Sequence, residues 1–278
     1  MNMASIFAET KQLPHIPRVV QELMESFRGE EHSLDLDDIS GKVAKDQSLT
    51  AKVLRLANSA HFGVPRTVAT PHDAVMLLGF STLRTMVLAS GVTGAFSELK
   101  DFDQNKFWKN AFGVAAISKW IAAYVPAADK ETAFTCGMMH SVGCLLMRMF
   151  NPAEATRIDE VEAMSTSKRH TLENGQFGYN YAEVGAELAK RWKFPEVIQH
   201  AIADQNTPEG EGEYSVEAGI IFIAKYLKRA HDENMNEDEI VAGFPLAVAD
   251  KIGMDVHRAY KDLAALGELS SGLDGLLD

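Results

Sequence analysis

Two polar side chains, His140 and Ser141, interrupt the most apolar stretch of the chain, residues 132–149. An imidazole can bind a metal ion or transfer a proton, and a serine hydroxyl becomes a nucleophile when a base activates it. Neighbours on a helix point in different directions and no carboxylate is adjacent, so the pair does not predict a Ser-His catalytic arrangement. Cys136 lies one helical turn earlier without a basic neighbour, so we expect an unreactive buried thiol.

Other residue patterns in the sequence do not provide a catalytic or binding partner for this imidazole. His200 precedes Asp204 by four residues and in principle reaches the same cavity, but such pairs are common on solvated helix faces, which is the interpretation we favour. Gly91 and Gly94 lack the lysine of a phosphate-binding loop. The residues alone therefore indicate one buried imidazole without a catalytic partner.

A second polar group ends a strongly amphipathic segment. Apolar residues recur at helical spacing through residues 49–60, and the segment closes with Asn58, Ser59 and His61. Two interpretations are open: these side chains cap the helix end and lie on the surface, or they form a polar rim for a partner or small ligand. In the second case Arg55 and Arg84 are available for a phosphate or carboxylate. We favour the first, because polar residues at helix ends usually bind the backbone.

Almost every segment that must position these residues has helical periodicity, and strand alternation is nearly absent, so we predict an all-α fold. Ser48 and Thr70 are expected N-caps, Pro71 a first helical residue and Gly79 a helix end. Asn236 and Glu239 form an expected capping box. The predicted helices cover residues 19–27, 36–43, 48–60, 71–78, 83–92, 107–125, 132–149 (broken at 140–143), 181–192, 195–203, 216–230 and two short segments within 245–269.

Short helices joined by tight turns predict an orthogonal bundle over residues 1–96, packed against a second helical bundle over residues 97–278. A charged linker, residues 97–106, separates them, although both bundles together are also compatible with one cooperative unit. Residues 204–278 carry 6 basic and 16 acidic side chains and hold most of the net charge of −12. Such a surface favours solubility and disfavours binding to nucleic acid.

The same composition argues against membrane insertion and secretion. We expect no membrane span, because the longest apolar runs fall short of about 20 residues, and residues 1–12 lack a basic region followed by an apolar one. The two cysteines, Cys136 and Cys144, lie in an apolar stretch and are expected to be buried thiols. A reducing cytoplasm is the location that fits these features.

Four motifs in this order resemble the HDOD family, a signalling branch of the HD-domain superfamily. The resemblance covers roughly residues 13–270. Its motifs are Leu13-Pro14-His15-Ile16-Pro17, the segment 46–63, Ala74-Val75-Met76-Leu77-Leu78-Gly79-Phe80-Ser81-Thr82-Leu83-Arg84, and Phe177-Gly178-Tyr179-Asn180-Tyr181-Ala182-Glu183-Val184-Gly185. The resemblance to the wider superfamily implies an all-helical metallophosphohydrolase whose histidines and aspartates bind one or two divalent ions.

Compared with that superfamily pattern, this chain keeps only one expected ligand, His140. The first histidine position holds Asn110, the aspartate of the His-Asp doublet is Ser141, and the last aspartate position holds Lys225. Asn180-Tyr181 and Gln205-Asn206 stand at the remaining ligand positions. Neutral amides and hydroxyls are poor substitutes for carboxylates, and an ammonium opposes entry of a cation. The resemblance thus implies a vestigial cavity without metal or cofactor.

The predicted function is accordingly a non-catalytic bacterial signalling or regulatory module of HDOD type that binds a protein or small-molecule partner. The alternative is a divergent metal-dependent phosphohydrolase acting on a nucleotide or cyclic dinucleotide. A third interpretation retains the pocket for a small anionic ligand, which Lys225 and Asn110 would hold without hydrolysis. The residues identify neither the partner nor the oligomeric state.

Overall fold

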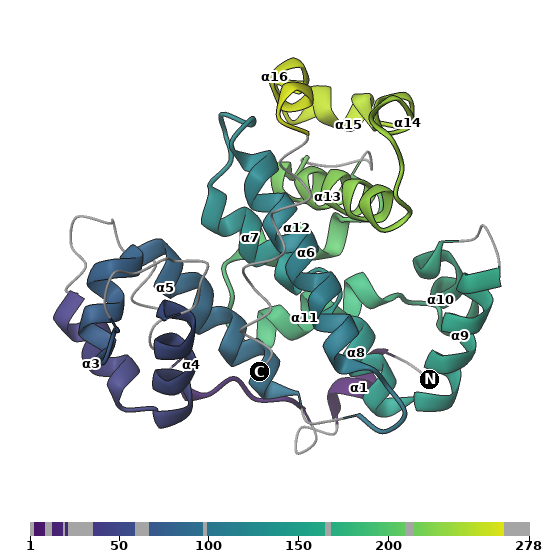
Figure 1. Ribbon diagram of the computed structural model, residues 1–278. Coiled ribbons are helices and arrows are strands. Elements are labelled where there is room, and N and C mark those ends of the chain that lie inside the picture. The colour runs from purple at the N-terminus through teal and green to yellow at the C-terminus, as the bar shows by residue number, and fades with distance from the viewer. Residues whose placement is uncertain are drawn as a thin grey trace. The chain divides into compact units, whose positions relative to one another are not determined.

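The computed structural model describes residues 3–8, 13–18, 20–21, 36–58, 67–96, 99–164, 168–208 and 214–263 (Figure 1). Their regular structure is helical and contains no strand, which confirms the predicted all-α class. These residues form two compact units. The smaller unit comprises the described residues of 14–98, and the larger unit comprises those of 1–13 and 99–269. The predicted helix over 19–27 lies mostly outside the described residues.

The smaller unit contains α3 (Leu36–Ala44), α4 (Gln47–Ala57) and α5 (Pro71–Ala95). Both α3 and α4 pack on α5 and on each other. The side chain of Thr70 caps α5 by accepting from Asp73 N, as predicted, and Gly79 interrupts the helix with a φ of 76°. The predicted cap of α4 is wrong: Ser48 lies inside the helix, and Asp46 Oδ1 accepts from Leu49 N at 2.9 Å. The carboxylate of Asp46, two residues before Ser48 and directly before the helix, reaches a free backbone amide of the first turn.

The larger unit contains the remaining helices. They are α1 (Met3–Ala8), α6 (Gln104–Ala122), α7 (Lys130–Met139), α8 (Val142–Phe150), α9 (Pro152–Met164), α10 (Arg169–Phe177), α11 (Tyr181–Arg191), α12 (Glu196–Asp204), α13 (Val216–Asp232), α14 (Glu237–Ala242), α15 (Leu246–Lys251) and α16 (Val256–Lys261). The capping box of Asn236 and Glu239 at the start of α14 is confirmed. In contrast, α1, α9 and α10 have no counterpart among the predicted helices.

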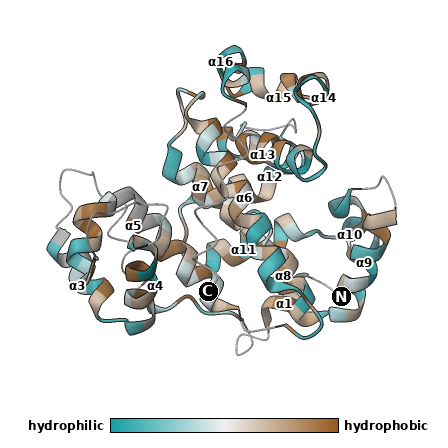
Figure 2. Cartoon of the chain, viewed as in Figure 1, coloured by the Kyte–Doolittle hydropathy of each residue, from teal (hydrophilic) through white to brown (hydrophobic). Residues whose placement is uncertain are grey.

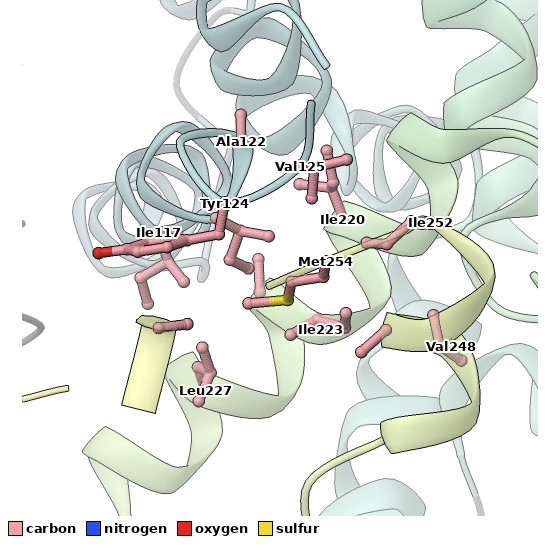
Figure 3. Packing of buried hydrophobic residues seen from close by; sticks show 14 of the residues in the cluster. Ile117, Ala122, Tyr124, Val125, Ile220, Ile223, Leu227, Val248, Ile252 and Met254 are labelled. Carbon is pink, nitrogen blue, oxygen red and sulfur yellow. The ribbon is translucent and has the colours of Figure 1, made fainter. Parts of the chain in front are cut away.

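A large apolar cluster joins α6 and α13 to the short C-terminal helices (Figure 3). Ile117 and Ile121 of α6 pack in this cluster with Ile223 and Leu227 of α13, and Met254 closes it from the segment between α15 and α16. Hydrophilic residues are prominent on α14 and α16, as Figure 2 shows. The acidic C-terminal region therefore contributes apolar side chains to the core while its charges face outward.

The stretch Lys130–Phe150 is long and apolar enough to cross a membrane, and 83% of its most apolar window is buried inside the structure. It is not one continuous helix, because α7 ends at Met139 and α8 begins at Val142. The break falls at His140 and Ser141, as the sequence indicates. Both helices are consequently central core elements, and their junction presents polar atoms in an apolar interior.

The helix α8 approaches α11 so closely that only glycine fits at Gly143. A Cβ atom there would lie 1.9 Å from the carbonyl oxygen of Tyr181 and 2.7 Å from Gly185 N. Both atoms belong to the backbone and cannot move aside independently. Gly143 thus determines the distance between the helix that follows His140 and the helix that begins with Tyr181.

Candidate functional site

A cleft of about 550 Å³ opens at the junction of α7 and α8. The start of α6, the first residue of α11 and the helices α9 and α10 form its walls. The lining residues are Asp101, Phe102, Asp103, Lys106, Phe107, Asn110, His140, Ser141, Cys144, Arg148, Thr156, Asp159, Glu162, Arg169 and Tyr181. The structure therefore brings Asn110, His140, Ser141 and Tyr181 together around one cavity.

His140 is 5% exposed, and its ring is fixed by a hydrogen bond. Its Nδ1 atom lies 2.6 Å from the carbonyl oxygen of Gly137, which can only accept, so Nδ1 carries the proton. Burial, together with the positive charge of Lys225, lowers the pKa of His140 to about 3. The imidazole is neutral at physiological pH, and Nε2 is a hydrogen-bond acceptor.

Lys225 of α13 contacts the hydroxyl of Tyr181. Its Nζ atom donates to Tyr181 Oη at 2.9 Å, to Asn206 Oδ1 at 2.8 Å and to Gln205 Oε1 at 3.2 Å. The Tyr181 hydroxyl in turn donates to Asn206 Oδ1 at 2.8 Å. We call these four residues the Lys225 cluster.

Gln205 connects the Lys225 cluster to the floor of the cleft. Its Nε2 atom donates to the carbonyl oxygen of His140 at 2.6 Å, and the side chain is completely buried. No carboxylate among the described residues forms an ion pair with Lys225. Burial without such a partner lowers the pKa of Lys225 to about 8, while burial raises that of Tyr181.

This environment predicts a pH dependence of stability. Because the pKa of Lys225 is about 8 in the folded protein and 10.5 is its ordinary value, the unfolded chain binds more protons between these pH values. The free energy of unfolding should therefore rise between pH 8 and 10.5, by about 2 kcal/mol after allowance for residual solvent access. Urea denaturation of the wild type and Lys225→Met across this range measures the difference, since all other groups titrate in both proteins. An equal pH dependence in the two proteins would contradict the buried ammonium.

The opposite wall of the cleft carries a network of charges. Arg148 and Arg169 both bind Asp159, and Arg169 also lies 3.5 Å from Glu162. Arg169 Nε donates to Glu173 Oε1 at 2.7 Å, and the other oxygen of Glu173 accepts from Tyr181 N at 2.7 Å. The guanidinium of Arg148 covers the ring of Phe102 at 4.4 Å. Both arginines are thus neutralised by neighbouring carboxylates.

Two thiols lie at this junction. Cys136 is completely buried, and burial raises its pKa well above the ordinary value. Cys144 lines the cleft, and burial raises its pKa to about 12. Because the thiolate is the reactive form, neither thiol is activated as a nucleophile.

The other predicted site residues lie elsewhere. Asn180 caps α11, where its side chain accepts from Ala182 N and Glu183 N, and it does not line the cleft. His200 and Asp204 are exposed and do not line the cleft either. The sequence analysis did not predict the charged wall of the cleft, whose residues come from the end of α8 and from α9 and α10. The spacing of acidic and basic residues in this part of the sequence was the signal that could have indicated it.

The predicted partner surface belongs to the smaller unit. Arg55 is exposed there. The side chain of Asn58 binds the backbone, since Nδ2 donates to the carbonyl oxygens of Leu54 and Val68 and Oδ1 accepts from Val68 N. Ser59, His61 and the side chain of Arg84 lie outside the described residues. Asn58 therefore connects the end of α4 to the backbone of Val68.

The residues around the cleft do not fit a divalent metal. No group of three or more His, Cys, Asp or Glu that could hold a metal ion occurs in the described part of the chain. The Lys225 ammonium binds three neutral oxygens of the cluster, and a hydroxyl, Ser141, follows His140. Divalent ions of phosphohydrolases require several carboxylate or imidazole ligands close together, and the carboxylates that line this cleft form no such group with His140 among the described residues.

Comparisons with known proteins identify relatives. The family model of the HDOD domain matches residues 13–208. A Shewanella amazonensis protein, whose crystal structure carries the name "Putative phosphohydrolase", has 34% identity and a TM-score of 0.83, with 99% of this chain and 98% of that chain covered. An HDOD domain protein with unknown function from Geobacter sulfurreducens has 20% identity and a TM-score of 0.80, with 99% and 98% covered, which shows a shared fold.

A curated relative is longer than this chain. An uncharacterized protein of Treponema pallidum (strain Nichols) is 26% identical over 239 residues, which make up 85% of this chain and 46% of that protein. The chain thus spans about half the length of this relative. The match adds a sequence relationship but no activity.

Proposed function

Because this chain belongs to the HDOD domain family, we propose that it is a non-catalytic signalling or regulatory module that binds a protein or small-molecule partner. The observation that carries this proposal is the set of three hydrogen bonds from Lys225 Nζ. In the superfamily the corresponding position supplies a carboxylate to a metal ion, whereas here a cation of the protein stands there. A cytoplasmic location is part of the same proposal.

Metal content tests the proposal directly. The untagged protein is dialysed against excess Mn²⁺ or Fe²⁺, desalted and analysed by inductively coupled plasma mass spectrometry. We expect no retained metal, because one neutral imidazole cannot hold a divalent ion against desalting. Retention near one ion per chain would contradict the vestigial site.

A variant with restored ligands provides the matched control. Asn110→His, Ser141→Asp and Lys225→Asp together replace an amide, a hydroxyl and an ammonium by groups that bind metal. We expect this triple variant to retain more metal than the wild type in the same experiment, provided that circular dichroism shows an intact helical fold. Equal, negligible retention in both proteins would mean that these positions are not the former ligand positions.

The alternative function is a divergent metal-dependent phosphohydrolase, which the name of the Shewanella relative favours. Hydrolysis of bis(4-nitrophenyl) phosphate in the presence of Mn²⁺ distinguishes it from the module. We expect no hydrolysis above the rate of Lys225→Met. Metal-dependent turnover by the wild type would support the enzyme instead.

A further inference from the structure

We propose that the cleft binds a neutral, planar amide- or lactam-type group through His140, Ser141 and Asn110. This inference rests on the proposed function, because a cavity without metal is free to hold an organic ligand. It specifies the chemistry of that ligand. The observations that support it are unpaired polar atoms, the balance of charge and the apolar wall.

Two polar atoms at the floor of the cleft, one of them buried, have no hydrogen-bond partner among the described residues. Ser141 is 8% exposed, and its hydroxyl makes no hydrogen bond with any described residue, although Ser141 precedes the first turn of α8. Among the hydrogen bonds of the described residues, His140 uses only Nδ1 and leaves Nε2 free. An unsatisfied buried hydroxyl costs free energy and is rare in folded proteins, so the Ser141 hydroxyl next to a free imidazole nitrogen in a cavity points to a ligand.

The hydrogen-bonding character of these atoms defines what the ligand must offer. His140 Nε2 can only accept, because Nδ1 carries the proton, so the ligand must present an N–H or O–H donor. The Ser141 hydroxyl and the exposed Asn110 amide can both donate and accept, and neither pairs with a described residue. A group with a donor beside an acceptor satisfies all three side chains.

Charge disfavours both a cationic and an anionic head group. The ammonium of Lys225 donates to the hydroxyl of Tyr181, which lines the cleft, so it would oppose a second cation there. An anion would face the lone pair of His140 Nε2. It would also meet a lining that has more carboxylates than cationic side chains. The carboxylates are Asp101, Asp103, Asp159 and Glu162, and the cationic side chains are Lys106, Arg148 and Arg169. A neutral group avoids both conflicts.

Aromatic residues just before and within the first turn of α6 supply a surface for the body of the ligand. Phe102 and Phe107 line the cleft with ring centroids 5.9 Å apart, and Asn110 follows Phe107 on the same helix. An aromatic or flat apolar ring attached to the amide can pack on Phe107 while the amide reaches the floor. The cleft of about 550 Å³ has room for a ring and further substituents.

Three fragments of equal shape test the chemistry: benzamide, benzoate and benzamidinium. Benzamide offers a donor and an acceptor, benzoate only acceptors and benzamidinium only donors. Dissociation constants come from amide chemical shifts of the isotope-labelled full chain in NMR titrations. We expect benzamide to bind about tenfold more tightly than either charged fragment, because benzoate offers no donor to His140 Nε2 and the Lys225 ammonium opposes the positive charge of benzamidinium. Preference for benzoate or benzamidinium, or binding of none, would overturn the proposal.

A pair of serine variants locates the binding. Ser141→Ala should weaken benzamide about tenfold by removing the floor hydroxyl. Ser118→Ala is the matched control, because the Ser118 hydroxyl is likewise buried and unpaired among the described residues, but Ser118 does not line the cleft. Equal affinities in the two variants would overturn the proposed contacts. If the fragments do not bind as expected and the protein also retains no metal, the ligand proposal is wrong but the proposed function stands. Metal retention in the dialysis experiment would contradict the proposed function, whatever the fragments do.

Discussion

Replacement of Gly143 by alanine is expected to lower the free energy of unfolding by about 3 kcal/mol or more. The added Cβ would lie 1.9 Å from the carbonyl oxygen of Tyr181, so α8 and α11 must separate. Separation also moves Tyr181, whose hydroxyl binds Lys225 and Asn206. Urea denaturation followed by circular dichroism measures the loss.

Gly175→Ala is the matched control for this change. Gly175 lies in α10, is exposed and has no atom within 4 Å of a Cβ built on it. Alanine in a helix interior is favoured over glycine, so stability should remain the same or rise by up to about 1 kcal/mol. Similar losses in both variants would show that the close approach of α8 and α11 does not limit stability.

Arg169→Met is expected to destabilise the protein by about 3 kcal/mol, because it leaves Glu173 as an unpaired buried carboxylate. Glu173 is completely buried, and its side chain accepts from Arg169 and from Tyr181 N. The apolar methionine replaces the stem of the arginine but not its charge. The loss is measured by urea denaturation at neutral pH.

The double variant Arg169→Met with Glu173→Met separates charge from packing. Removal of both charges eliminates the buried carboxylate, so the double variant should recover much of the stability lost by Arg169→Met. Strictly additive losses from the two substitutions would contradict the view that these side chains act as a buried pair.

Strong apolar periodicity made most of the fold predictable. The helices α6, α8, α11, α12 and α13 each have apolar positions at helical spacing, and prolines, glycines and capping residues mark their ends. Asn236 with Glu239 and Thr70 with Pro71 are local signals that depend on no distant residue. The prediction of Ser48 as the cap of α4 was wrong because Asp46, two residues earlier, offers a competing acceptor, and the sequence alone does not decide between the two.

The helices α9 and α10 were not predictable by the same criterion. Only Ala155 and Ile158 of α9 are buried, and the single buried residue of α10 is the charged Glu173. A search for an apolar stripe does not find such helices, because α10 is held by ion pairs rather than by an apolar face. The charged wall of the cleft was therefore missed together with the elements that carry it.

The candidate site could be predicted as a set of residue types but not as a hydrogen-bonding pattern. Lys225, Tyr181, Gln205 and Asn206 come from three segments, and only the tertiary structure shows that the ammonium binds the other three side chains. The free Nε2 of His140 likewise depends on which oxygen lies near Nδ1. These contacts join residues that are far apart in sequence, and the periodicity of apolar residues does not predict such contacts.

The position of α1 has a consequence for the order in which the chain folds during synthesis. Ile6 lines a small cavity with Met147 and Phe177, and the ring of Phe7 lies 4.6 Å beneath the guanidinium of Arg191. At about 5–20 residues per second, the ribosome needs about 10–40 seconds to reach these partners after it has made α1. The contiguous helices α3, α4 and α5 emerge in the meantime. The helix α1 is thus synthesised before α3, α4 and α5 but acquires its native contacts only after all three have emerged.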